Sequence, residues 1–184
     1  MQAVIADLSI VNYCHPSCEP LKNIMRLPRE QAFALARELA ERNPETTAFY
    51  RFADFANYYP RRMKTDALLR TRFMELGGQP AEAHPLSFVL QGSSFLDNWF
   101  GNGTVTRIPL RQIPAGSVSF TYGDSMTMLE KHGDFRLVTR DMLLAEIVAS
   151  GSVEAFLAQV AEQYRYIEVQ LWDDACLHKG AASR

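Results

Sequence analysis

The segment from Val105 to Met126, VTRIPLRQIPAGSVSFTYGDSM, carries the clearest strand pattern of the chain. It predicts two strands that meet at a Pro-Ala-Gly turn, followed at once by a helix that starts at Gly-Asp-Ser. The second strand alternates between large apolar residues on one face and hydroxyl residues on the other. The apolar face carries Val118, Phe120 and Tyr122, and the opposite face carries Ser119 and Thr121. Such alternation is typical of a strand that covers a hydrophobic core with one face only.

A later strand, predicted over 166–172, alternates in the same manner. Its core face carries Ile167, Val169 and Leu171, and its opposite face carries Tyr166, Glu168, Gln170 and Trp172. An ordinary solvated strand face is one interpretation. The other is a functional face, because a carboxylate between aromatic rings is partly desolvated and is a better candidate for catalysis than a free surface carboxylate.

An early strand, predicted over 8–13, leads into residues 14–18, CHPSC. The proline ends the strand, and the serine is predicted to cap a short helix that runs to Met25. A zinc site built on Cys14, His15 and Cys18 is rejected, because the spacing is looser than the usual CxxC and no fourth ligand is evident. We expect both cysteines to be free thiols without a metal.

Helices dominate the first half of the chain. The spacing predicts one helix from Pro28 to about Arg42 and another from Pro60 to Leu76, ended by the glycine pair 77–78. Between them, the segment 48–60 carries six aromatic residues, interpreted as core residues or, alternatively, as the lining of a pocket. The second helix also holds the main local basic density, which is either a solvated face or a phosphate contact. Those basic residues are Arg61, Arg62, Lys64, Arg70 and Arg72.

The same helix contains Asp66 and Arg70, four residues apart among apolar neighbours. This spacing predicts either an intrahelical ion pair at the edge of the core or a charge pair that faces a site. Further along, 86–91 is predicted to be an interior strand, and 135–139 another strand. Thr139 and Ser152 are each predicted to cap a helix, and Ser93 is predicted to cap a single helical turn.

Composition limits the class of protein. The chain has 184 residues, of which 47% are hydrophobic and 22% charged, with a net charge of −2. These values predict one domain over 1–184. The residue patterns predict that it is mainly helical over 16–85 and strand-rich over 86–172, with a flexible tail over 178–184. No global basic field favours nucleic acid or an anionic membrane. We find no secretory signal and no apolar run of about 18 residues, and we expect a cytoplasmic protein with reduced thiols.

Three short motifs together resemble the ADP-ribosyltransferase-like superfamily. They are the early strand that ends in His15, the central strand and turn VSFTYGDSM, and the late strand YIEVQLW. The chain is most similar to the DNA-targeting ADP-ribosyltransferase toxins, and the resemblance covers about thirty residues. It implies that NAD is consumed as a substrate, and it leaves the acceptor, protein or nucleic acid, open.

The resemblance also implies roles for individual residues. Glu168 would be the catalytic carboxylate, with His15 and Tyr122 as its catalytic partners. The NAD-binding residues would be His15, Tyr13, Ser119, Thr121, Tyr122 and Trp172. Breaking the nicotinamide–ribose bond builds positive charge on the sugar, so a fixed carboxylate stabilises the transition state.

The combined expectation is an α+β fold with a mixed, mostly antiparallel central sheet and helices packed on it, ADP-ribosyltransferase-like. The expected function is cleavage of the nicotinamide–ribose bond of NAD. The alternative is a non-catalytic protein that docks through the aromatic segment 48–60 and the basic helix 60–76. The two hypotheses differ in whether His15, Tyr122 and Glu168 converge, with His15 and Glu168 on neighbouring strands.

Overall fold

A single sheet organises the chain. The computed structural model describes residue 5 and residues 7–179, and within that range six strands pair in the order β3-β1-β2-β6-β4-β5. The strands are β1 (Ser9–Cys14), β2 (Leu86–Leu90), β3 (Thr104–Pro109), β4 (Val118–Tyr122), β5 (Leu137–Thr139) and β6 (Ile167–Leu171). Every ladder between these strands is antiparallel. The predicted α+β class is therefore confirmed.

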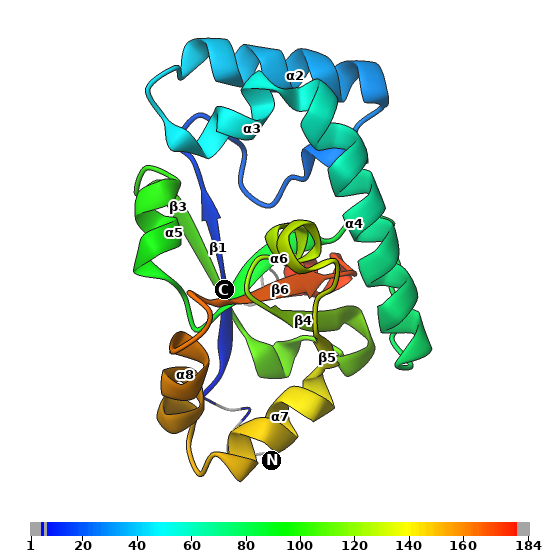
Figure 1. Cartoon of the computed structure of the whole chain (residues 1–184), viewed down its shortest axis with the longest axis vertical. Helices are drawn as coiled ribbons and strands as arrows, with labels where there is room; N and C mark the ends of the chain where they lie inside the picture. The colour runs from blue at the N-terminus through cyan, green and yellow to red at the C-terminus, as the bar shows by residue number, and fades with distance from the viewer. Residues whose placement is uncertain (1–4, 6, 180–184) are drawn as a thin grey trace.

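Helices cover both faces of this sheet (Figure 1). They are α2 (Arg29–Arg42), α3 (Tyr50–Ala53), α4 (Phe55–Glu75), α5 (Ser94–Trp99), α6 (Ser125–His132), α7 (Arg140–Ala149), α8 (Val153–Ala161) and α9 (Ala175–Lys179). Short 3₁₀ turns lie at η1 (Ile24–Arg26), η2 (Thr47–Phe49), η3 (Leu110–Gln112) and η4 (Ala115–Ser117). α7 and α8 lie on one side of the sheet, whereas α4 and α6 lie on the other.

The main hydrophobic core lies between the sheet, α7 and α8. The apolar residues of β4 and β6 that alternation placed on one face, such as Phe120 and Val169, are buried there against Leu143, Ile147 and Phe156. A second core on the opposite face joins α4 to the sheet, where Phe73 stacks on Trp172 with ring centroids 6.1 Å apart. The facing assigned to β4 and β6 from alternation is confirmed.

A third cluster explains the aromatic segment. Phe55, Tyr58 and Tyr59 at the start of α4 pack with Ala32 and Ala36 of α2. The core interpretation of segment 48–60 holds for these residues. Packing against α2 also draws the turn before Pro60 into the helix, so α4 begins at Phe55 and the proline lies inside it. The prediction that Pro60 opens this helix was wrong.

Several helix boundaries follow their predicted caps. The Thr139 side chain accepts from the backbone N–H of Met142, and the Ser152 side chain accepts from that of Ala155. The predicted cap at Ser93 accepts from the N–H of Leu96, and Asp124, which was not predicted as a cap, accepts from the N–H of Thr127 at 2.7 Å. Each of these bonds satisfies an N–H that has no partner inside its helix.

Two local predictions need correction. No regular helix runs from Ser17 to Met25, because Leu21 has φ of 58°, and a 3₁₀ turn capped by Asn23 stands in its place. The strands β3 and β4, predicted to meet at the Pro-Ala-Gly turn, do not pair with each other. β3 is an edge strand beside β1, whereas β4 lies between β6 and β5.

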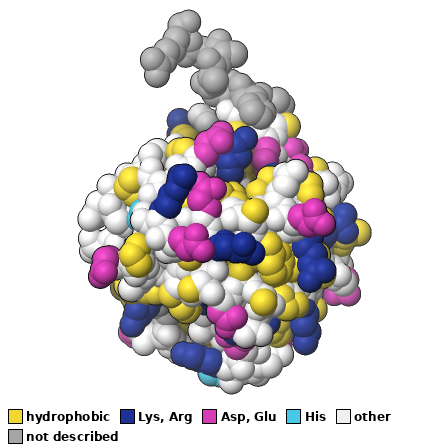
Figure 2. Space-filling model, turned by 90° about the horizontal axis from the view of Figure 1, so that it is seen from above, with side chains coloured by type: hydrophobic (Ala, Val, Ile, Leu, Met, Phe, Trp, Pro, Cys, Tyr) yellow, Lys and Arg dark blue, Asp and Glu magenta, His cyan; other side chains and the backbone are white. Residues whose placement is uncertain are grey.

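Acidic and basic side chains are interspersed on the surface seen from above, at the end of the molecule where α2 and α3 lie (Figure 2). In the described part of the chain, no single helix is long and apolar enough to cross a membrane; α7 and α8 meet that test only as a pair, bent by 98°. Of the tail predicted over 178–184, α9 includes the backbone to Lys179, and residues 180–184 lie outside the described range.

Candidate functional site

Glu168 lies in the middle of the sheet face opposite the main core. Its cross-strand neighbours are Val89 on β2 and Thr121 on β4. Thr121 in turn pairs on its other side with Leu137 on β5. We call the face that carries Ser119, Thr121, Glu168 and Gln170 the polar face. α4 and α6 cover it, so Glu168 is only 5% exposed. The interpretation of this face as solvated is therefore wrong, and Glu168 is a desolvated carboxylate.

Hydrogen bonds hold the Glu168 carboxylate in place. Its Oε2 accepts from the backbone N–H of Ser125 at 2.8 Å, at the first turn of α6, and from the Thr121 hydroxyl at 3.3 Å. Its Oε1 lies 3.8 Å from a terminal nitrogen of Arg62, on α4. Contacts from β4, α6 and α4 thus hold the Glu168 carboxylate in one position.

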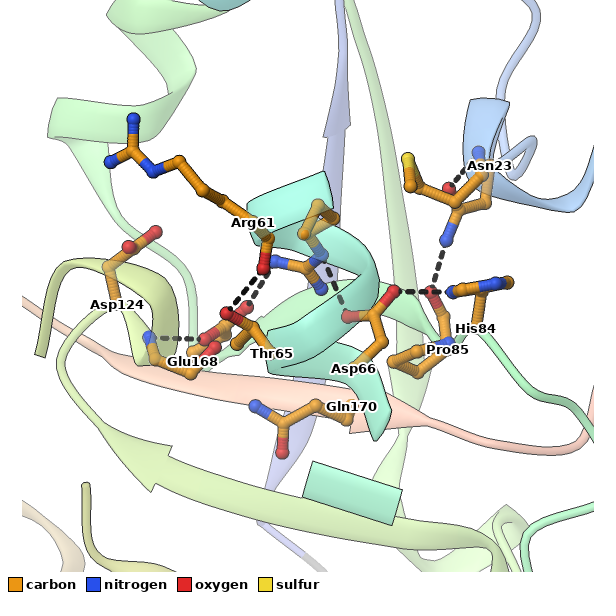
Figure 3. A network of polar contacts seen from close by, with 12 residues as sticks. Asn23, Arg61, Thr65, Asp66, His84, Pro85, Asp124, Glu168 and Gln170 are labelled. Carbon is orange, nitrogen blue, oxygen red and sulfur yellow. Dashed lines mark hydrogen bonds and ion pairs between the residues drawn. The ribbon is translucent and has the colours of Figure 1, made fainter. Parts of the chain in front are cut away.

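Arg62 belongs to a longer chain of buried charges. Its Nε lies 2.8 Å from Asp66, and the other oxygen of Asp66 lies 2.7 Å from Nδ1 of His84. Figure 3 shows Asp66 pointing toward His84 on one side and toward the charged groups of α4 on the other. Arg70 does not pair with Asp66 and instead contacts Met74. The predicted Asp66–Arg70 pair is replaced by Arg62–Asp66.

Hydrogen bonds also connect the polar side chains along the sheet. Trp172 donates to Ser119, Ser119 donates to Gln170, and Gln170 donates to Thr121, at distances of 2.8 to 2.9 Å. Thr121 in turn donates to Glu168. Because these groups are buried, each bond removes a desolvation cost that the fold would otherwise carry.

The charges around Glu168 oppose one another. Burial raises the pKa of Glu168 above its ordinary value, and Asp124 raises it further, whereas Arg62 and hydrogen bonds from Ser125 lower it. Burial would lower the pKa of Arg62, but Asp66, Tyr58 and Glu168 raise it, so the guanidinium is cationic. The carboxyl groups of Glu168 and Asp124 thus lie near the Arg62 cation in a poorly solvated space. Enzymes shift the pKa values of catalytic acids and bases in such environments.

A cavity of about 240 Å³ lies beside this cluster, between α3, the first turns of α4, and α6. Its lining residues are Tyr50, Arg51, Asp54, Asn57, Tyr58, Arg61, Met126 and Glu130. Arg51 lies over the ring of Tyr58, 5.8 Å from its centroid. Burial raises the pKa of Tyr58, and the nearby charges of Arg62, Arg51 and Asp124 also act on it. Tyr58 thus lines the cavity and lies within electrostatic reach of Arg62, the cation that contacts Glu168.

Asp124 connects the cavity to Glu168. It hydrogen bonds to Tyr166, whose pKa is raised first by burial and then by Asp124 and Glu168. Arg51, from the cavity wall, is within electrostatic reach of Asp124. A larger cavity, about 380 Å³, is lined by Met128, His132, Gln163 and Tyr164. We place the candidate site at the smaller cavity because the opposed charges gather behind it.

The predicted partners of Glu168 do not converge with it. His15 lies just beyond β1, and β2 separates β1 from β6, so the prediction of neighbouring strands was wrong. The His15 ring packs edge-on against Phe49 with centroids 4.7 Å apart, and burial lowers its pKa. The hydroxyl of Tyr13 accepts from the N–H of Ser93. Both residues have local structural contacts instead.

Tyr122 lies on the opposite face of the sheet from Glu168. It packs in the main core beside Phe156 and donates its hydroxyl to Glu146. Strand geometry requires this, because Tyr122 follows Thr121 and successive side chains point to opposite faces. Trp172 lies on the polar face but is fully buried under Phe73, so it is closed to a ligand. Of the predicted NAD-binding residues, Thr121 contacts Glu168, and Ser119 is connected to it through Gln170.

Sequence reasoning missed Arg62, Asp124, His84 and the cavity residues of α3 and α4. The alternative interpretations contained part of the signal, since an aromatic-lined pocket and a charge pair facing a site were both considered. Nothing in the spacing distinguishes Arg62 from its exposed neighbour Arg61. Within the described ranges, no group of three or more His, Cys, Asp or Glu side chains is placed to hold a metal ion.

No protein-family model, no curated protein and no solved structure matches this chain.

Proposed function

We propose that the protein binds NAD at the cavity between α3, α4 and α6 and cleaves its nicotinamide–ribose bond. The observation that supports this most strongly is the fixed, buried carboxylate of Glu168, held by Ser125, Thr121 and Arg62 beside Asp124. A preorganised negative charge of this kind stabilises the positive charge that builds on the sugar when an N-glycosidic bond breaks.

The cavity walls suit the two ends of such a substrate. Tyr50 and Tyr58 offer aromatic surface for a flat nicotinamide ring, and Arg51 and Arg61 offer cations for a pyrophosphate. The cavity volume, about 240 Å³, is below the ordinary range of ligand sites, roughly 300–1,000 Å³. It would therefore hold the nicotinamide and its ribose, with the remainder of the dinucleotide across the open side.

The roles in this proposal differ from those implied by the resemblance. Glu168 keeps the transition-state role, and Asp124 is placed to act with it as a second carboxylate. Tyr58 replaces Tyr122 as the aromatic residue nearest the reacting bond, because Tyr122 faces the other side of the sheet. Arg51 replaces His15 as the residue that orients the substrate.

The docking alternative has one observation in its favour. Tyr50, in the aromatic segment, is 54% exposed, and Met63 and Met74 on α4 are 38% and 49% exposed. Exposed aromatic and methionine side chains are common at protein interfaces. However, Arg62, Phe55 and Phe73 of the same segments are buried and unavailable to a partner.

Release of nicotinamide from NAD, followed by chromatography, tests the proposal. The wild-type chain should release nicotinamide, and Glu168→Gln should release it about 100-fold more slowly or not at all. Glu146→Gln is a matched control, because Glu146 is also a carboxylate with a tyrosine and an arginine partner but lies toward the main core side of the sheet. It should retain turnover.

The contrary result is also informative. A folded wild-type chain that neither turns over NAD nor gains thermal stability from millimolar NAD or ADP-ribose would exclude this function. The docking alternative would then be the better supported of the two functions. Circular dichroism spectra of all the variants must match the wild-type spectrum for either conclusion to hold.

A further inference from the structure

His84 is the outermost member of the chain of buried charges that ends at Glu168. Its Nδ1 lies 2.7 Å from Asp66, and a carboxylate can only accept, so Nδ1 carries the proton. The contacts then continue from Asp66 to Arg62 at 2.8 Å and from Arg62 to Glu168 at 3.8 Å. A residue in the loop between α4 and β2 is thus connected to the candidate carboxylate through two side chains (Figure 3).

The loop that carries His84 is itself held firmly. Arg26 donates from Nε to the His84 carbonyl at 2.7 Å, and Asn23 donates to the Pro85 carbonyl at 2.7 Å. Arg26 is also paired with Asp174. These contacts tie the His84 backbone to η1 and to the segment after β6, so the imidazole has a fixed point from which to orient Asp66.

Asp66 needs both of its partners because it is completely buried. An unpaired carboxylate oxygen in such a place is costly. If the His84 donor were lost, Arg62 would be the remaining partner of Asp66, and a guanidinium can bind both oxygens of a carboxylate in a bidentate pair. The guanidinium would then turn toward Asp66 and away from Glu168, where its contact is already the longest in the chain.

We propose that His84 is a positioning residue, which occupies one oxygen of Asp66 and so leaves the Arg62 guanidinium directed at Glu168. The positioning itself does not need NAD; only its catalytic consequence rests on the proposed function. The charged or hydrogen-bonding groups that face Glu168 are Arg62 from α4, Asp124 and Ser125 at the start of α6, Thr121 from β4, and Tyr166 just before β6.

Titration of Glu168 by carbon-13 NMR tests this inference. The chain is labelled at the glutamate carboxyl carbon, and the Glu168 signal is identified by its loss in Glu168→Gln. His84→Phe removes the donor, and the Glu168 midpoint should then rise by about one unit or more, the ordinary effect of losing a nearby opposite charge. His84→Gln keeps an N–H donor and should restore most of the wild-type midpoint.

Asp66→Asn tests the competition of Asp66 and Glu168 for Arg62. The asparagine carries no charge, so the guanidinium should move toward Glu168, and the Glu168 midpoint should fall. Arg136→Gln, which breaks a pair with Glu146 toward the main core side of the sheet, is the control and should leave the midpoint unchanged.

An unchanged midpoint in folded His84→Phe, or a raised midpoint in Asp66→Asn, overturns the inference. If His84→Phe does not fold, the Asp66→Asn result decides. NAD turnover is measured on the same variants. A raised midpoint in His84→Phe, in a protein without turnover, would support positioning while removing the proposed function, so the two failures remain distinct.

Discussion

Glu168 shows what burial does to one ionisable side chain. Burial and Asp124 raise its pKa above the ordinary value of 4.5. The folded state therefore holds this proton at pH values where the unfolded chain has already released it. Folding stability falls as the pH rises from 4.5 through the raised pKa, because ionisation is easier in the unfolded state.

We predict a pH-dependent effect of Glu168→Gln on stability. The neutral amide does not ionise, so the variant should gain thermal stability relative to the wild type as the pH rises above 4.5. Melting temperatures of both proteins between pH 4 and 8, roughly the range in which a raised carboxyl titrates, provide the measurement. A difference in melting temperature that stays constant over this range would contradict the prediction.

Cys18 gives a second residue-scale prediction. Burial, and then the nearby Cys14, raise the pKa of Cys18 from 9.0 to about 11. Since each unit changes the thiolate fraction tenfold, Cys18 at pH 8 should react with a thiol reagent about 100-fold more slowly in the folded than in the urea-unfolded chain. A chain with Cys14→Ser and Cys176→Ser isolates this thiol and keeps burial, the larger cause of the raised pKa. Equal rates, or stoichiometric zinc that is lost in Cys18→Ser, would contradict a free, partly buried thiol at Cys18.

At the residue scale, the sequence predicted which face of the sheet a strand residue occupies, but it did not predict which distant residues contact it. Alternation placed Thr121 and Glu168 on one face, because the period of a strand is a property of neighbouring residues. The partner Arg62 could not be found in this way. Arg61 and Arg62 are adjacent in sequence, and only the packing of α4 on the sheet decides that one is buried and the other exposed.

At the scale of elements, local chemistry decided most boundaries. The caps at Ser93, Thr139 and Ser152 were readable because a side-chain acceptor and the N–H groups it satisfies lie within three residues. Pro60 misled the same reasoning, because proline favours a first turn but packing of Phe55 and its neighbours against α2 extends the helix before it.

The end of α4 carries an element-scale prediction. A Cβ built on Gly78 would lie 2.5 Å from the ring of the buried Phe73, which stacks on Trp172. Gly78→Ala should therefore destabilise the protein by about 1–3 kcal/mol through overpacking, measured by urea unfolding. Gly133→Ala is the comparison, because that position at the end of α6 has positive φ but nothing within 4 Å. A smaller cost at Gly78 than at Gly133 would show that the Phe73 ring yields easily.

At the scale of the whole molecule, strand order is the feature that the sequence did not reveal. β1 and β6 each have a readable pattern, but β2 lies between them, and only long-range pairing decides this. The proposed convergence of His15 with Glu168 failed for that reason. The α+β class itself depends on element types and lengths, which are local, and it was predictable.

The shared core predicts cooperative unfolding. Trp172 is buried between α4 and the sheet, so it reports on the contact between the helical first half and the strand-rich second half. Urea unfolding of a Trp99→Phe chain, followed by tryptophan fluorescence and by far-ultraviolet circular dichroism, should give coincident transitions. Separate midpoints would show that residues 16–85 and 86–172 unfold independently.

The place of β6 in the sheet has a consequence for biosynthesis. β6 is the last strand of the described residues, yet it lies between β2 and β4, which do not pair with each other. On the ribosome, β1, β2 and β3 can pair first, and β4 and β5 can pair separately. Until residue 171 emerges from the exit tunnel, the edges of β2 and β4 that later pair with β6 remain unpaired. Nascent chains that stall before this point should engage chaperones, and Glu168 arrives with the strand that joins the two pieces.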